Sequence, residues 1–423
     1  MRGAGSFWLG VDNRSLASLV HTSKAKTSTA AAGAGTRPPA VLQVLPRLVT
    51  GGVERGTVVV AAALVAGGWK AVVASEGGPM VREIERAGAT HVELPLASKN
   101  PFTMRRNVER LAQLIRRERI DIVHARSRAP AWSALGAARR TGIHFVTTFH
   151  NAYGDDTWLK RRYNAVMAEG ERVIAISRFV AEHAMSVYGV PPEKLRIIER
   201  GVDFGRFDPE RVSAERVIRL AREWQLPDGL QVVMLPGRLT RWKGQMVLVD
   251  ALARLGRRDL RCVLVGTGEG RYRHQLIETI AKKGLGGLFQ MIEDCRDIPA
   301  AYMLADVVVS ASTRPEGFGR IIAEAQAMGR PVIATDHGGA REIVLVGETG
   351  WLVPPDDPDA LAAAIAGALA LTPAQRMGLA QHAIAHMRAH FTTQAMTDRT
   401  LSVYSEILFP AASEADPGGP VAA

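Results

Sequence analysis

The chain has 423 residues, of which 47% are hydrophobic and 22% charged, and its formal net charge is +11. This length allows two ordinary domains, each with its own buried core, and no uninterrupted apolar segment is long enough to cross a bilayer. The two cysteines, Cys262 and Cys295, form no CxxC pair, and no histidine cluster has metal-ligand spacing, so neither a disulfide framework nor a zinc site is indicated. We therefore expect a protein of the reducing cytoplasm that is not integral to a membrane.

The positive charge is concentrated in the front half of the chain. Counting Lys and Arg against Asp and Glu, residues 1–37 carry +4, residues 38–200 carry +9 and residues 201–423 carry −2. A basic face of this kind suits anionic lipid head groups, an acidic acceptor or nucleic acid, although solubility alone also explains it.

The two ends of the chain have no sustained periodicity. Residues 1–37 are rich in Ala, Gly, Ser and Thr, which predicts a disordered lead-in, and residues 411–423 are expected to form a disordered tail. A signal peptide is not expected, because Asp12, Asn13 and Arg14 interrupt the apolar part of residues 6–20.

From residue 40 the pattern repeats as strand, turn and helix. Strands are expected at residues 41–46, 71–75, 91–96, 121–126, 144–150 and 171–177. Helices are expected at residues 51–66, 81–88, 104–119 and 129–138. The helix at 104–119 places its apolar residues on one face and Arg106, Arg110 and Arg117 on the other. Strands that alternate with helices at this spacing predict a parallel, doubly wound sheet in a domain over residues 38–204.

A second round of the same pattern predicts a second domain over residues 205–390. Its strands are expected at residues 231–237, 261–265, 289–292, 307–309, 331–336 and 350–354. Helices are expected at residues 244–255 and 272–283, with two more after residue 354. A linker is expected around residues 201–209, and a last helix at 392–408 within a C-terminal segment of residues 391–410.

The sequence PEGFGRIIAEAQAMG, at residues 315–329, joins a valine strand to a glycine-bearing turn and a helix. Glu316 lies in the turn, and Glu324 lies at the edge of the apolar stripe of the helix. An acid near a helix start, where free N–H groups attract anions, can accept hydrogen bonds from the hydroxyls of a ligand. Taken alone, two such acids are better explained as a turn acid and a rim carboxylate than as ligand-binding groups.

This stretch resembles the Glu-x7-Glu signature of retaining, nucleotide-sugar-dependent glycosyltransferases of family 4. Glu316 and Glu324 keep the spacing, Gly-Phe-Gly stands at 317–319, and PVIATDHGGAREIV follows at 331–344. The resemblance covers about residues 40–390 and looks closest to bacterial enzymes of lipopolysaccharide core or related envelope glycans. It implies an α/β protein of the GT-B fold, with two Rossmann-like domains facing across a cleft and a final helix that crosses back to the first domain.

The resemblance also implies roles in donor binding. Glu324 would hold the ribose hydroxyls, while Glu316 and the backbone amides around Phe318 and Gly319 would hold the transferred sugar.

Two cations stand where a loop meets a helix start. In PGRLTRWKG, at residues 236–244, Arg238 and Lys243 suit a diphosphate, because Arg offers a forked contact and Lys a point charge. The resemblance assigns them the neutralisation of the departing diphosphate, where preorganised charge is worth several kcal/mol.

In the front half, Gly51 and Gly52 follow a strand and resemble the family's glycine loop near the donor phosphate and sugar. His150 ends a strand at the carboxyl edge of the expected sheet, where such sheets bind ligands, and the resemblance makes it the histidine that touches the sugar. Ser177 and Arg178 match a family strand end on the acceptor side.

The linker stretch GVDFGRF, at residues 201–207, matches a family motif with one departure. Glu199 and Arg200 stand where the family more often has proline and asparagine, so the resemblance assigns no ligand contact from this segment.

A metal ion or a cofactor is not expected. The sole Asp-x-Asp sequence, Asp357 to Asp359, precedes an alanine-rich helix, where Asp serves as a cap or first-turn acid. In GT-B enzymes basic side chains generally take the place of the divalent ion, and Arg238 with Lys243 meet that need.

These features together predict a retaining hexosyltransferase that uses a UDP-sugar or GDP-sugar donor. Its acceptor would be a glycan or lipid, reached by peripheral attachment to the anionic inner leaflet, and nucleic acid is not an expected partner because no interleaved aromatic and basic motif is present. The alternatives are a nucleotide-sugar 2-epimerase or phosphorylase of the same architecture, or a basic binding module without catalysis. Residues 292–297, near the expected base site, have no pattern that selects uridine or guanosine.

Overall fold

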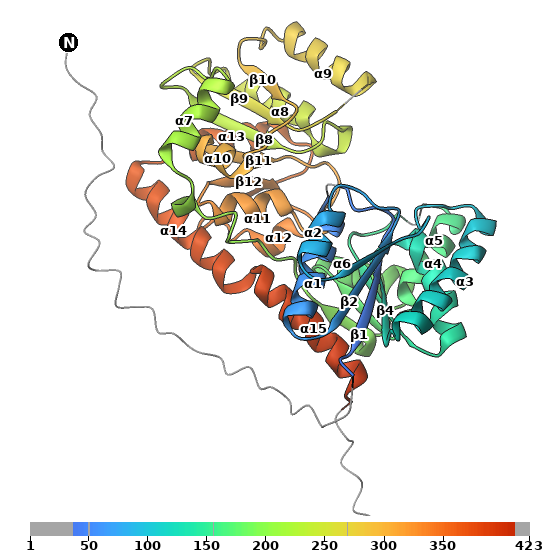
Figure 1. The fold of residues 1–423 in the computed structure, drawn as a ribbon. Coiled ribbons are helices and arrows are strands. Elements are labelled where there is room, and N and C mark those ends of the chain that lie inside the picture. Colours follow the sequence, from blue (N-terminus) through green and yellow to red (C-terminus); the bar gives the residue numbers. More distant parts are fainter. Residues whose placement is uncertain (1–36, 50, 155, 269, 411–423) are drawn as a thin grey trace, which may run out of the picture. The chain divides into compact units, whose positions relative to one another are not determined.

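The computed structural model describes residues 37–410 except residues 50, 155 and 269. The lead-in expected at residues 1–37 lies outside this range apart from residue 37, and so does the tail expected at residues 411–423. From Pro39 onward the described residues form one unit, organised around two parallel sheets (Figure 1).

The first sheet has seven strands in the order β3-β2-β1-β4-β5-β6-β7, and every neighbouring pair is parallel. The strands are β1 (Ala40–Val44), β2 (Lys70–Ser75), β3 (Thr90–Glu93), β4 (Ile122–Ala125), β5 (His144–Phe149), β6 (Arg172–Ala175) and β7 (Leu195–Ile197). The helices between them are α1 (Gly52–Ala66), α2 (Val81–Arg86), α3 (Pro101–Glu118), α4 (Arg128–Thr141), α5 (Trp158–Asn164) and α6 (Arg178–Tyr188).

The second sheet has six strands in the order β10-β9-β8-β11-β12-β13, again all parallel. The strands are β8 (Gln231–Pro236), β9 (Leu260–Val265), β10 (Phe289–Ile292), β11 (Val307–Ser310), β12 (Val332–Thr335) and β13 (Gly350–Val353). The helices of this half are α7 (Ala214–Glu223), α8 (Gln245–Leu255), α9 (Arg271–Lys282), α10 (Ile298–Leu304), α11 (Arg320–Ala327), α12 (Ala340–Ile343), α13 (Pro358–Leu369) and α14 (Pro373–His390).

The central strands of both sheets are buried throughout, as expected where helices cover both faces of a parallel sheet. All five residues of β1 and all four of β11 are buried. The strands expected from the sequence are confirmed within a few residues, and the two doubly wound α/β halves confirm the expected GT-B fold.

The last helix, α15 (Thr393–Leu408), returns to the first sheet, as the resemblance implied (Figure 1). Val403, Tyr404 and Ile407 pack into the same apolar cluster as β1, and the Tyr404 hydroxyl lies 2.6 Å from Nδ1 of the buried His124. Burial raises the pKa of Tyr404, so its hydroxyl stays protonated.

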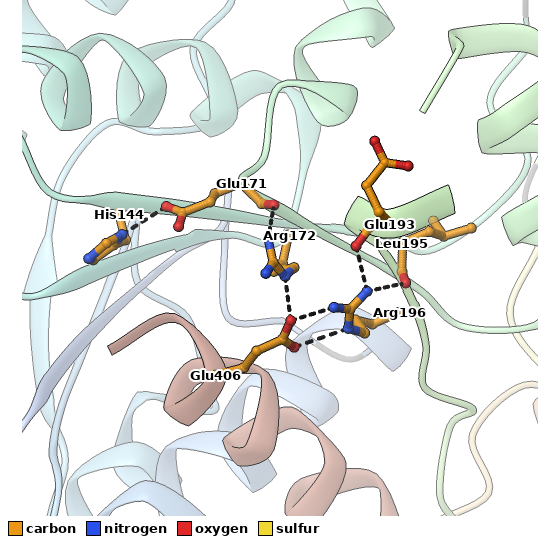
Figure 2. Close-up of polar contacts among 7 residues, drawn as sticks. All are labelled: His144, Glu171, Arg172, Glu193, Leu195, Arg196 and Glu406. Atoms are coloured by element: carbon orange, nitrogen blue, oxygen red, sulfur yellow. Dashed lines mark hydrogen bonds and ion pairs between the residues drawn. The ribbon is translucent and has the colours of Figure 1, made fainter. Parts of the chain in front are cut away.

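Glu406 holds α15 to the edge of the first sheet through two arginines, and Figure 2 shows this arrangement. Nε of Arg172, on β6, donates to Glu406 at 2.8 Å, and Nε of Arg196, on β7, donates at 3.0 Å. Arg196 is itself fixed by the carbonyls of Glu193 and Leu195. These ion pairs join residues that are far apart in the chain.

Several helices were not expected from the sequence. They are α5, α6, α7, α10 and α12, all of which have eleven residues or fewer. The helix expected at 104–119 begins earlier, at Pro101, because the side chain of Asn100 accepts from the amides of Phe102 and Thr103. Within the described residues, no helix combines the length and the apolar composition that a membrane crossing requires.

Candidate functional site

In each sheet the strand order reverses at one point, between β1 and β4 in the first and between β8 and β11 in the second. Parallel α/β sheets bind ligands outside the carboxyl ends of the strands at this point. Most of the residues singled out from the sequence lie in the loops that follow these four strands or β5. The carboxyl edges of both sheets are therefore the candidate site.

At the edge of the second sheet, Lys243 and Glu316 form an ion pair. Nζ of Lys243 donates to Oε1 of Glu316 at 2.8 Å, and the Ser312 hydroxyl donates to the same oxygen at 2.5 Å. Both charged side chains are largely buried, with 12% and 20% of their side-chain surface exposed. The two loops predicted to meet here do meet, and a small hollow beside Glu316 is lined in part by Gly319 and His337.

Glycine allows these loops to pack closely. Gly244 has a φ of 73°, and a Cβ at this position would stand 1.7 Å from the carbonyl oxygen of Ala311, so no other residue fits. Arg238 lies on the same loop, but its side chain is exposed and has no hydrogen bond or ion pair with a described residue. The structure therefore unites Lys243 with Glu316 and leaves Arg238 free to reach a ligand.

Helix α11 starts at the centre of this edge and carries Glu324. Gly319, with a φ of 96°, precedes its first residue, and no side chain caps it, so the amides of its first turn are available to a ligand. The ring of Phe318 packs against that of Phe391.

Glu324 is held by two partners. Its Oε2 accepts from the Tyr302 hydroxyl at 3.0 Å, and its Oε1 pairs with Nε of Arg320 at 3.2 Å. Burial raises the pKa of Glu324, and Arg320 and Tyr302 oppose that rise. A carboxylate with two oxygens still has lone pairs for ligand hydroxyls.

At the edge of the first sheet, His150 directly follows β5. Its Nδ1 lies 2.9 Å from Nη2 of Arg200, and because a guanidinium can only donate, Nδ1 must accept. Burial, followed by the charges of Arg200, Arg126 and His124, holds the pKa of His150 well below its ordinary value. The ring is therefore neutral, with its hydrogen on Nε2, which is buried and has no partner among the described residues.

Arg126 and Arg200 are site residues that the sequence reading missed. Arg126 directly follows β4, and Arg200 follows β7 and donates to the carbonyl of Gly52. A Cβ at Gly52 would stand 3.2 Å from Nη1 of Arg200 and 3.6 Å from Nη1 of Arg320, so glycine here makes room for guanidinium groups from both halves. Gly51, in contrast, has an extended backbone and would meet only the flexible side chain of Glu54. In the sequence, only the departure from the family pattern at position 200 indicated that Arg200 belongs to the site.

The two edges also contact each other through described residues of both halves. A Cβ at Gly317 would stand 2.9 Å from the carbonyl oxygen of His150, which places the turn of Glu316 against the end of β5. The carboxylate of Glu342, on α12, accepts from the amides of Arg178 and Phe179 at 2.8 Å each. Glu342 therefore caps α6 of the first half from the second half.

The structure also shows the roles of Ser177 and Asp357. The Ser177 hydroxyl is buried and accepts from the amide of Val180, so it caps α6 and does not line an acceptor surface. Asp357 accepts from the amides of Asp359 and Ala360, which confirms its expected role as a cap of α13. Across the part of the chain that the structure describes, no group of three His, Cys, Asp or Glu side chains is arranged to hold a metal ion.

Comparison with known proteins gives the family. Residues 218–384 match the family described as glycosyl transferases group 1, and residues 50–206 match glycosyltransferase family 4. D-inositol 3-phosphate glycosyltransferase from Salinispora tropica is 32% identical over 68% of this chain and 64% of its own length, slightly under two thirds. The enzyme of the same name from Salinispora arenicola is 32% identical over 68% of both chains.

Solved structures agree on the fold. A glycosyltransferase from Rickettsia africae is 36% identical, with a TM-score of 0.82 over 89% of this chain and 100% of its own. HepE of Anabaena, solved in complex with UDP, is 23% identical, with a TM-score of 0.77 over 87% of this chain and 100% of its own. The chain belongs to the group 1 and family 4 glycosyltransferases of the GT-B fold.

Proposed function

We propose that the protein transfers a hexosyl group from a nucleoside diphosphate sugar to an acceptor hydroxyl, with retention of anomeric configuration. The observation that supports this best is the buried Lys243–Glu316 pair beside the uncapped start of α11, with Glu324 on the same helix. It combines cationic and amide donors for phosphate with carboxylates for sugar hydroxyls.

In this proposal the second sheet binds the donor. Glu324 accepts from the ribose hydroxyls, and Arg238, Lys243 and the amides at Phe318 and Gly319 face the diphosphate and the sugar. HepE was solved with UDP and with UDP-glucose, so UDP-sugars come first among the donors to test, followed by GDP-sugars. The Gly51–Gly52 loop closes on the donor from the other side.

His150 acts in the proposal as a hydrogen-bond donor and not as a base. Its Nδ1 is occupied by Arg200 and its Nε2 carries the hydrogen, so it has no free lone pair that could take a proton. Nε2–H donates to a hydroxyl of the transferred sugar and fixes the ring at the reacting carbon.

Transfer on one face of the sugar requires no covalent nucleophile from the protein. The bond between the anomeric carbon and the diphosphate oxygen breaks, the acceptor oxygen bonds to the same carbon, and its proton passes to the leaving diphosphate. The carboxylate of Glu316 already accepts from Lys243 and Ser312, which favours a role in holding the sugar over a role as nucleophile. Arg238 and Lys243 stabilise the charge on the departing diphosphate.

The acceptor is proposed to enter from the first half, as part of a glycan or lipid of the cell envelope. Helix α5 supports attachment to an anionic membrane surface, because Trp158 and Leu159 are exposed beside Lys160, Arg161 and Arg162. The names of the two Salinispora relatives favour a second acceptor class, a polyol phosphate.

Screening the purified protein against UDP- and GDP-sugars, by nucleotide release and thermal shift, tests the proposal. Turnover of at least one donor with retained anomeric configuration in the product is the expected result. A free 2-epimer of the donor sugar would support the epimerase instead, and salt-sensitive nucleic-acid binding without donor turnover would support the binding module. We propose a metal-independent reaction, so EDTA should leave the rate unchanged.

A further inference from the structure

Three basic side chains from separate loops gather at the carboxyl edge of the first sheet. Arg126 follows β4, His150 follows β5 and Arg200 follows β7, and all three line one hollow. Met396 and Thr400 of α15 also line the hollow. Arg126 and Arg200 have no part in the proposed donor site, whereas His150 also serves that site through the hydrogen on its Nε2.

The hollow contains hydrogen-bond donors that no protein group satisfies. Arg126 is 5% exposed, and its Nε has no acceptor among the described residues. Nε2 of His150, which carries the hydrogen of the neutral ring, also has none. Leaving a buried donor unpaired costs about 1–3 kcal/mol, and more for a charged group, so the Arg126 guanidinium in particular requires an acceptor from outside the protein.

The charges in the hollow are also not balanced. A Cβ at Gly56 would stand 3.0 Å from Nη2 of Arg126 and 3.6 Å from Nη1 of Arg200, so two guanidinium groups approach the same face of α1. Neither forms an ion pair with a described carboxylate. Burial, and then the charges of Arg126 and Arg320, lower the pKa of Arg200 to about 9. Neighbouring buried cations are costly unless an anion lies between them.

We propose that this hollow is a subsite for an anionic oxygen group, a phosphate or a carboxylate, on the acceptor substrate. The assignment to the acceptor substrate rests on the proposed function, whereas the assignment of an anion rests on the residues described above. Arg126 and Arg200 bind the oxygens through their guanidinium groups. The same chemistry can come from the donor if the transferred sugar is a uronic acid, and the experiment separates these two sources.

Titration of inorganic phosphate into the full-length protein, followed by calorimetry, tests the subsite. The titration is made both without UDP and with UDP at saturation, which occupies the donor side. Arg126→Gln and Arg200→Gln should each weaken phosphate binding by about tenfold to a hundredfold, the range for hydrogen bonds to charged groups, and Arg126→Lys should restore part of it. Arg106→Gln, which removes an exposed cation from α3, is the matched control and should bind phosphate as the original protein does.

A comparison of UDP-glucose with UDP-glucuronate, made in the same variants, identifies the source of the anion. If the group belongs to the acceptor, Arg126→Gln changes the affinity for both donors equally and phosphate still binds beside UDP. Selective loss of UDP-glucuronate binding would assign the subsite to the donor sugar and overturn the acceptor role. Equal phosphate affinity in all variants, or binding that UDP abolishes, would show an adventitious ion or the donor site and overturn the subsite itself.

This experiment fails independently of the proposed function. A protein that binds phosphate through Arg126 and Arg200 but turns over no nucleotide sugar would retain the anion subsite and lose the transferase proposal. If the protein turns over a nucleotide sugar but Arg126→Gln leaves its phosphate affinity unchanged, the transferase proposal stands and the anion subsite is overturned.

Discussion

At the carboxyl edge of the second sheet the buried cation Lys243 is ion-paired with Glu316, whereas Arg126 and Arg200 at the edge of the first sheet form no ion pair with a described residue. The charge of Glu54 raises the pKa of Arg200 but does not offset burial and the neighbouring arginines. A balanced edge is stable when empty, and its ligand must fit between charges that are already satisfied. An unbalanced edge is costly when empty and gains most when an anion enters. The difference indicates that the two halves select their ligands in different ways.

The largest expected effect comes from removing the donor-side cations. Arg238→Ala combined with Lys243→Ala should lower kcat by roughly a hundredfold to a thousandfold, because preorganised charge at a departing anion is lost. Single-turnover kinetics with the best donor measures this. Arg271→Ala with Lys282→Ala removes two exposed cations from α9 and should change nothing. Near-normal kcat in the first pair would remove both residues from the mechanism.

Next in size is the loss of the ribose contact. Glu324→Ala should raise the Kd for UDP by about tenfold to a hundredfold and change the melting temperature little. Because burial raises the pKa of Glu324, UDP affinity should begin to fall on acidification at a higher pH than an ordinary glutamate would give. Calorimetry over a pH series checks both points, and Glu278→Ala, an exposed acid on α9, is the control. An unchanged Kd would contradict the ribose role.

The comparison of the two edges can be tested directly with one substitution on each side. Arg126→Met removes an unpaired buried charge and should raise the free energy of unfolding of the empty protein by about 1 kcal/mol or more. Lys243→Met leaves Glu316 without its cation and should lower it by about 2 kcal/mol. Urea titration without ligand measures both. Changes of the same sign would show that the edges do not differ in charge balance.

A smaller effect is expected at the contact between the halves. Glu342→Ala removes both acceptors at the start of α6 and should lower the free energy of unfolding by about 1 kcal/mol, as for other helix caps. It should also raise the KM for the donor, since the two edges meet here. Glu348→Ala, an exposed neighbour, serves as the control in both assays. An unaffected KM would limit Glu342 to a structural role.

The smallest effect is expected at Glu406, which forms ion pairs with Arg172 and Arg196 of the first sheet. The hydrogen bond from Arg196, then that from Arg172, lowers the pKa of Glu406. The contribution of Glu406 to the free energy of unfolding is complete at pH values above the ordinary carboxyl pKa. It is lost as the pH falls through the lowered pKa of Glu406. Because the group is partly exposed, Glu406→Gln should cost only about 0.5 kcal/mol at neutral pH. The difference from the original protein, followed by urea titration, should vanish in acid, and a difference that persists there would exclude this ion-pair contribution.

Much of the architecture could be predicted because the strands are short apolar runs between helices, and parallel order follows from that alternation. The Lys243–Glu316 contact was within reach, since both residues lie in loops that follow neighbouring strands of one sheet. Contacts that join segments far apart in the sequence could not be predicted. The amide of Arg178 and Glu342 are 164 residues apart, and His124 and Tyr404 are 280 apart. Arg126 read as the polar end of a strand, because nothing local tells a buried arginine from an exposed one.

The position of α15 has a consequence for how the molecule is made. The front half needs Tyr404 to satisfy His124 and needs Val403 and Ile407 to complete the apolar cluster around β1. Domains generally fold as they leave the ribosome, starting from the N-terminus. Here the first domain cannot complete the apolar cluster around β1 until translation has passed residue 408, so the residues that α15 covers stay exposed during synthesis.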